Sequence, residues 1–161
     1  MKRESLLVLL LVFVLLLIGC AGKEEITGQQ MVMAQIEFTE SYFSIMDEIA
    51  EVYSEYIAFN ISEQNFKEHI TEYLKRIELE EKRYEEFNEK YILNPENVDK
   101  NVLRAIALSE EARSLVKSVL EKTIDKGRAL PREELLELYI ERAGKIQDIM
   151  DEFKKVVDMI E

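Results

Sequence analysis

MVMAQIEFTESYFSIMDEIAEVYSEYI, residues 31–57, decides the fold of this chain. Two stripes of mostly apolar residues run through it side by side, and successive residues of each stripe lie alternately three and four positions apart. That period is typical of an α-helix with a wide apolar face that packs against other helices. We therefore predict a helix at 29–59, with Thr27 as its N-cap and Gln30 completing a capping box. The stripes comprise Met31, Gln35, Phe38, Tyr42, Ile45, Ile49, Val52 and Tyr56, and Val32, Ile36, Thr39, Phe43, Met46, Ala50, Tyr53 and Ile57.

Three later segments repeat this period, and residues that favour turns or helix starts separate them. Ser62 follows the first helix as a cap, Asn94-Pro95 restarts the chain, and Gly127 and Pro131 separate the last two segments. The chain of 161 residues has only five Gly and two Pro, which suits long helices. The predicted later helices are 63–93, 95–125 and 131–161.

We predict an all-α fold, an antiparallel up-down-up-down bundle of four long helices. The alternating steps favour coiled-coil-like packing, and the short connections favour antiparallel neighbours. An alternative arrangement satisfies the same pattern. In it, two helical hairpins open and pair with a second copy, which gives a homodimer.

The N-terminus carries a secretion signal. Lys2 and Arg3 precede thirteen apolar residues, Leu6 to Ile18. A membrane-spanning helix needs about 20 such residues, so export followed by cleavage is favoured over a permanent span.

The junction Leu17-Ile18-Gly19-Cys20 resembles the lipobox of prokaryotic lipoproteins. The resemblance covers residues 1–20. It implies cleavage before Cys20 and a lipid on its thiol, which anchors the chain on the extracytoplasmic face of the cell membrane. An uncleaved anchor with an ordinary cysteine is the alternative. The predicted division is a signal peptide at 1–19, a lipidated Cys and polar tether at 20–28, and the bundle at 29–161.

Composition limits the partners. The mature chain would carry 19 Lys and Arg against 32 Asp and Glu, a net charge of −13. Nucleic-acid binding needs a basic surface, so we expect no nucleic-acid partner. The predicted partners are the membrane, through the lipid on Cys20, and a protein with a basic surface.

Sites for chemistry are sparse in the sequence. His69 is the one histidine and Cys20 the one cysteine, and the five glycines form no phosphate loop. We therefore expect no metal site, no cofactor and no catalytic residue.

One acidic residue interrupts a predicted apolar stripe. Glu80 falls in the stripe of helix 63–93, level with Ser109 of the next helix. A buried carboxylate needs a partner, so we predict a core polar layer in which Glu80 bonds Ser109 or Arg113. The alternatives are a ligand pocket between the last three helices, lined by small residues, or rotation of Glu80 to the surface.

Helix 29–59 contains no Lys or Arg, although it carries several carboxylates. Like charges four residues apart, as at Glu51 and Glu55, repel one another on a helix. Bridges from neighbouring helices, such as those from Lys75 or Arg76, would offset this repulsion. The other hypothesis is that a basic partner or divalent cations bind a face formed by Glu48, Glu51 and Glu55.

Asn60-Ile61-Ser62 also matches the N-glycosylation pattern, with Asn60 in a predicted loop. The sequence thus predicts a lipid-anchored, extracytoplasmic helical lipoprotein that acts as a non-catalytic binding or scaffold module. The alternative function is binding of a small ligand in a core pocket between the last three helices.

Overall fold

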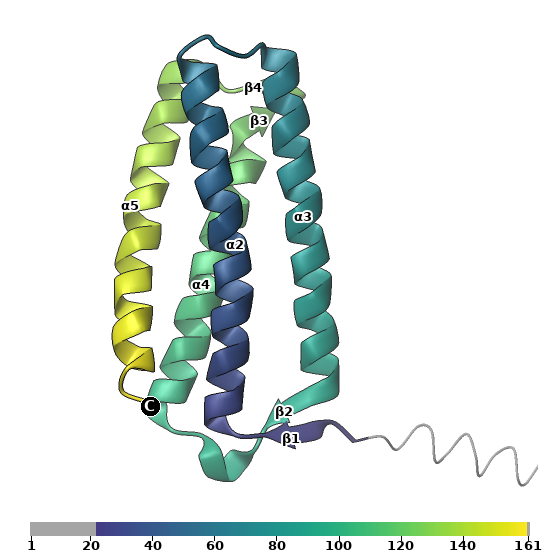
Figure 1. Cartoon of the computed structure of the whole chain (residues 1–161), viewed down its shortest axis with the longest axis vertical. Helices are drawn as coiled ribbons and strands as arrows, with labels where there is room; N and C mark the ends of the chain where they lie inside the picture. Colours follow the sequence, from purple (N-terminus) through teal and green to yellow (C-terminus); the bar gives the residue numbers. More distant parts are fainter. Residues whose placement is uncertain (1–21, 161) are drawn as a thin grey trace, which may run out of the picture.

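The computed structural model describes residues 22–160, and for Asn97 the backbone alone. It contains four long helices, which confirms the predicted all-α class (Figure 1). The signal peptide and Cys20 lie outside the described residues. The helices are α2 (Gly28–Ile57), α3 (Glu63–Lys90), α4 (Lys100–Thr123) and α5 (Arg132–Val157).

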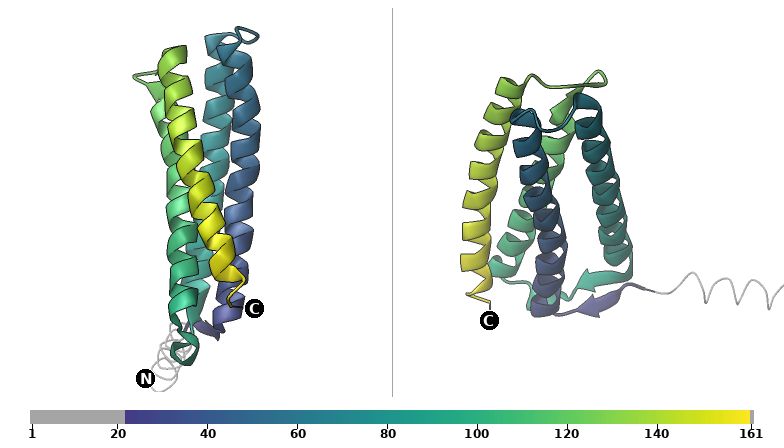
Figure 2. Two further views of the ribbon diagram at one scale, coloured as in Figure 1. Left: turned by 90° about the vertical axis from the view of Figure 1, so that its left-hand side faces the viewer. Right: turned by 45° about the horizontal axis from the view of Figure 1, so that its top comes forward.

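Figures 1 and 2 show the four helices side by side along one long axis. Residues 58–62 connect α2 to α3 at the end drawn uppermost in Figure 1, which we call the upper end. The connection from α4 to α5, residues 124–131, lies at the same end. The opposite, lower end holds the start of α2, the connection from α3 to α4 and the C-terminus.

Side-chain caps fix where the helices begin. Thr27 accepts a hydrogen bond from the backbone of Gln30, and the Gln30 side chain accepts one from the backbone of Thr27. This confirms the predicted capping box, and Ser62 caps α3 as predicted. By contrast, α4 begins at Lys100 rather than at the predicted residue 95. The Asp99 carboxylate caps α4 there, after a 3-10 turn over Pro95–Asn97.

A short parallel strand pair ties the start of the described chain to the end of α3. Strand β1 (Glu24–Ile26) pairs with β2 (Tyr91–Leu93), and the Asn94 N–H donates to the Ile26 carbonyl at 2.9 Å. The first segment was predicted to be part of a polar tether and the second to be part of a helix, and both predictions are corrected. Ile26 is buried, so the contact hides apolar surface as well as backbone groups.

At the upper end, β3 (Ile124–Asp125) and β4 (Arg128–Ala129) form a tight antiparallel hairpin. Its two central residues, Lys126 and Gly127, have positive φ of 48° and 79°. Hairpin turns of two residues with this geometry favour glycine, which explains why the helix before Gly127 stops.

The buried apolar residues form two clusters along the axis. The upper core contains residues from all four helices: Tyr42, Ile45, Met46, Ile49, Tyr53, Tyr56, Phe66, Ile70, Tyr73, Ile77, Val116, Val119, Leu120, Leu135 and Ile146. The lower core is built from α2, α4 and α5 alone: Val32, Val102, Ala105, Leu108, Phe153 and Val156. Helix α3 therefore joins the common core only through its first half.

Candidate functional site

A buried polar layer lies on α2 and α4. It consists of Gln35, Thr39, Ser109 and Arg113, each at most 6% exposed. The Ser109 hydroxyl donates to Gln35 Oε1 at 3.0 Å and lies 2.7 Å from the Thr39 hydroxyl. Arg113 Nη2 donates to the same Gln35 oxygen at 3.1 Å. Gln35 therefore joins the two helices through one carbonyl oxygen.

Arg113 is a buried cation whose close partners are neutral. Its Nε donates to the Ser109 carbonyl at 3.3 Å, and its guanidinium lies 3.8 Å from the centre of the Tyr84 ring. Within residues 22–160, no carboxylate oxygen lies within 4 Å of its guanidinium nitrogens. Buried charges are usually paired with an opposite charge, because removing an ion from water is costly.

Arg113 also lines a cavity of about 510 Å³ bordered by α2, α3 and α4. At the cavity wall, Lys117 Nζ bonds Glu81 at 2.7 Å, and the Tyr84 hydroxyl donates to Glu110 at 2.8 Å. The hydrogen bond from Lys117 to Glu81 raises the pKa of that lysine. The cavity is lined by Tyr42, Glu81, Tyr84, Glu85, Glu110, Arg113, Ser114 and Lys117.

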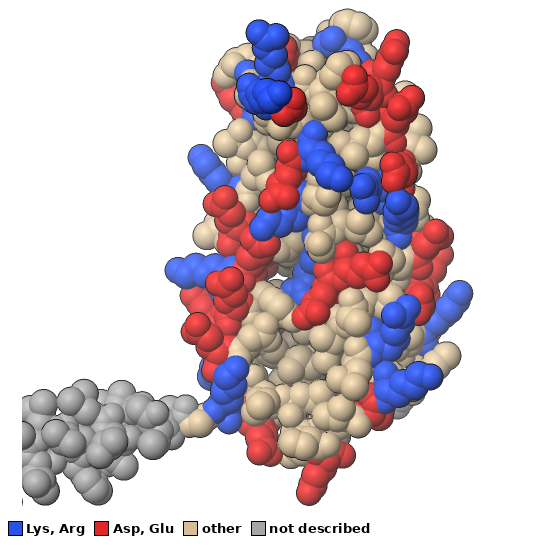
Figure 3. Space-filling model, turned by 180° about the vertical axis from the view of Figure 1, so that it is seen from behind, with Lys and Arg blue, Asp and Glu red and all other residues tan. Residues whose placement is uncertain are grey.

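The surface around this cavity carries both charges. Figure 3 views the molecule from behind and shows acidic and basic groups interspersed over that face. A larger depression of about 650 Å³ lies between α3 and the hairpin β3–β4, but none of its lining residues is buried. The cavity beside Arg113 therefore differs from this depression, because two of its lining residues, Tyr42 and Arg113, are buried polar residues.

Tyr42 forms the part of the cavity wall that comes from α2. Its side chain is only 3% exposed, and burial raises the pKa of its hydroxyl to about 12, with the Glu81 carboxylate adding to the effect. The phenol is consequently neutral at ordinary pH and can donate a hydrogen bond.

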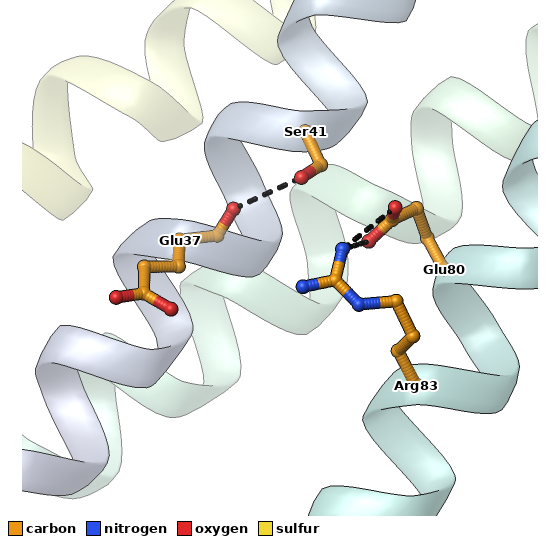
Figure 4. Close-up of polar contacts among 4 residues, drawn as sticks. All are labelled: Glu37, Ser41, Glu80 and Arg83. Atoms are coloured by element: carbon orange, nitrogen blue, oxygen red, sulfur yellow. Dashed lines mark hydrogen bonds and ion pairs between the residues drawn. The ribbon is translucent and has the colours of Figure 1, made fainter.

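Glu80 does not belong to the polar layer, which corrects the prediction. Its carboxylate accepts from Nη1 of Arg83 at 2.8 and 2.9 Å, within the same helix (Figure 4). Nearby, Ser41 donates to the backbone carbonyl of Glu37 in its own helix (Figure 4). The layer exists at Ser109, as predicted, but its partner is Gln35 of α2. The available signal was the polarity of Gln35 and Thr39 at stripe positions.

The predicted acidic face on α2 is not uniform. Glu48 accepts two hydrogen bonds from Arg76 of α3, at 2.6 and 2.8 Å, and these bonds lower the pKa of its carboxyl. Glu51 and Glu55 form no ion pair with any residue between 22 and 160. The structure thus places Glu48 in a bridge between helices and leaves the other two open to solvent or to a partner.

The remaining candidates are dispersed. Asn60 is exposed in the turn between α2 and α3, and His69 is exposed on α3. The suggested pocket involved the last three helices, whereas the cavity beside Arg113 is lined from α2, α3 and α4. Cys20 lies outside the described residues.

Two features are absent from the described residues, 22–160. No helix there is both long and apolar enough to cross a bilayer. No group of three or more His, Cys, Asp or Glu side chains in that range is placed to hold a metal ion.

In comparisons with family models, curated protein sequences and solved structures, none matches this chain.

Proposed function

We propose that this chain is a lipoprotein, anchored through lipid on Cys20 at the extracytoplasmic face of the cell membrane, that acts as a non-catalytic binding or scaffold module. Its body is an up-down-up-down helical bundle with coiled-coil-like packing. The apolar run that ends at Gly19-Cys20 supports export and anchoring.

The observation that carries the proposal is the apolar run of residues 6–18 that ends at Gly19-Cys20. The position of β1 relative to Cys20 sets how far the bundle would stand from that anchor. The first residue of β1, Glu24, stands only four residues after Cys20, and β1 is hydrogen-bonded to β2. Four residues span at most about 14 Å. An anchored bundle would therefore be held close to the bilayer, with its lower end beside the anchor.

Intact-mass measurement of the protein purified from membranes tests the anchor. We expect a chain that begins at Cys20 with an added lipid mass and that partitions into detergent. Cys20→Ser should leave an uncleaved precursor or a product without lipid. A wild-type chain that begins at Met1 and carries no modification would contradict the proposal.

The binding surface favoured by the contacts lies on the outer side of α2. Asp47, Glu51 and Glu55 form no ion pairs within residues 22–160, whereas Glu48 is held by Arg76. We propose that these unpaired carboxylates attract a protein partner with a basic surface.

Pull-down from solubilised membranes with the anchored chain tests this surface. Partners captured through it should be lost in Glu51→Lys/Glu55→Lys and at about 0.5 M salt, where the Debye length is about 4 Å. Glu133→Lys/Glu137→Lys, a matched double reversal on α5, should keep them. Retention of the same partners by the α2 variant, with an unchanged melting temperature, would exclude this face.

A further inference from the structure

Two donor groups reach the cavity bordered by α2, α3 and α4 and have no acceptor among residues 22–160, although the residues that carry them are almost entirely buried. The Tyr42 hydroxyl has no hydrogen-bond partner among residues 22–160, although its side chain is only 3% exposed. Arg113 uses Nε and Nη2 for Ser109 and Gln35, and within the same residues its Nη1 has no acceptor. Both side chains line the same cavity.

The charge of Arg113 is also left without a counter-ion. Of the three carboxylates that line the cavity, Glu81 is held by Lys117 and Glu110 accepts from Tyr84. Glu85 forms no ion pair with any residue in the described range. The cavity thus offers an unpaired cation and a neutral phenol on one part of its wall, and an unpaired carboxylate on another.

These groups favour a ligand that carries both a carboxylate and an ammonium group. A carboxylate accepts two hydrogen bonds readily from a guanidinium and a phenol, and such charge-assisted bonds are strong. A phosphate group would suffer more repulsion from the three glutamates, because it carries more negative charge. An ammonium group would instead be attracted to Glu85.

We propose that this cavity binds a small zwitterion, an α-amino acid or a short peptide, with its carboxylate on Arg113 and Tyr42 and its ammonium group toward Glu85. The volume of about 510 Å³ falls within the range of small-molecule sites. This inference goes beyond the proposed function and does not depend on the lipid anchor.

Calorimetric titration of the full chain in detergent tests the site. The probes are the free L-amino acids and dipeptides of the form Xaa-Ala, each at about 5 mM, a concentration that reveals millimolar affinity. We expect at least one probe to bind. Its amide, which lacks the carboxylate, and its N-acetyl form, which lacks the ammonium group, should each bind about tenfold or more weakly.

Variants locate the binding in the cavity. Arg113→Gln should abolish it, and Tyr42→Phe should weaken it about three- to tenfold, the effect of one hydrogen bond. Tyr73→Phe is the matched control, because Tyr73 is also a buried tyrosine but does not line the cavity, and it should bind like wild type. If Arg113→Gln fails to fold, the Tyr42→Phe variant and the blocked probes still decide the outcome.

Three results would overturn the inference. They are the absence of binding by every probe, unchanged affinity in both cavity variants, and equal affinity for the N-acetyl form. The last would show a simple carboxylate site rather than a zwitterion site. Because the titration is carried out in detergent solution, a negative result leaves the membrane anchor untouched, and loss of the anchor leaves the titration unchanged.

Discussion

The two halves of α3 differ although their sequences follow one pattern. In the first half, Phe66, Ile70, Tyr73 and Ile77 are all buried in the upper core. In the second half, Glu80, Tyr84 and Phe87 continue the same spacing, but none of them is buried. Tyr84 and Phe87 instead pack edge-on against Phe38 of α2.

This difference shows that one periodic stripe can serve two purposes. Where α3 contacts the other helices through apolar residues, the stripe builds the core. Where α4 presents Arg113 and Lys117, one residue of the same stripe, Tyr84, forms part of the wall of a cavity. We expect the upper half to account for most of the stability and the lower half to tolerate change.

The largest contrast should come from removing one aromatic ring in each half. Phe66 is fully buried and stacks on Tyr56 with ring centres 4.2 Å apart, so Phe66→Ala should lower the free energy of unfolding by about 3–5 kcal/mol. Phe87 is half-buried, and Phe87→Ala should cost about 1 kcal/mol. Urea unfolding measures both variants, and equal losses would erase the distinction between the halves.

Replacement of the residue at the centre of the polar layer should have the next largest effect. Gln35→Leu removes the acceptor used by Ser109 and Arg113, and should destabilise the fold by about 1–3 kcal/mol. Gln35→Glu should cost less, because a carboxylate at this position would pair with Arg113. The control is Met46→Leu in the upper core, expected to cost less than about 1.5 kcal/mol. A Gln35→Leu variant as stable as wild type would show that the layer is not structural.

High pH should separate wild type from Tyr42→Phe. Burial raises the pKa of Tyr42 to about 12 from its ordinary value of about 10, so its neutral form is favoured in the folded state. Its contribution to stability is complete below pH 10 and is lost as the pH rises toward 12, by at most about 1.4 kcal/mol per pH unit.

The measurement is urea unfolding of both proteins across this pH range. Tyr42→Phe should lose less stability there than wild type. Tyr53, which lies deeper in the upper core, also has a raised pKa and is present in both proteins, so its effect cancels in the comparison. If the free energy of unfolding fell equally with pH in the two proteins, the loss of stability at high pH would not come from Tyr42.

The smallest effect is expected at Glu80, in the second half of α3. Its partner, Arg83, is 60% exposed at the side chain, and exposed ion pairs contribute at most about 1 kcal/mol. Glu80→Gln should therefore change the free energy of unfolding by about 0.5 kcal/mol or less in thermal or urea unfolding. A loss of several kcal/mol would restore Glu80 to the buried layer from which the structure removes it.

Local signals in the sequence predicted the helices well. The alternating steps gave the four helical segments, and Thr27, Ser62 and Gly127 marked their limits because caps and turns depend on nearby residues alone. The start of α4 was predicted at the wrong residue. Asn94-Pro95 and Asp99 both resemble helix starts, and only the structure shows that Asp99 is the N-cap of α4.

Contacts between distant residues could not be predicted in the same way. The pairing of Glu24–Ile26 with Tyr91–Leu93 joins segments of three residues, which are too short to show a strand period. The polar layer was foreseen at Ser109, but its partner was assigned to Glu80. Glu80 is charged, so its place in an apolar stripe predicts a buried polar contact, whereas the neutral Gln35 fits the same spacing as its apolar neighbours.

The pairing of β1 with β2 determines how a mechanical load would travel through an anchored protein. A pull on Cys20 would reach β1 first and would slide it along β2, so the hydrogen bonds between the strands would be loaded together in shear. Because Tyr91 follows α3 directly, the force would then pass into α3, whereas α2, the helix next in sequence, would carry less of it. In a chain lipidated at Cys20, the strand pair would therefore take up part of the tension before it reached α2 and its polar layer.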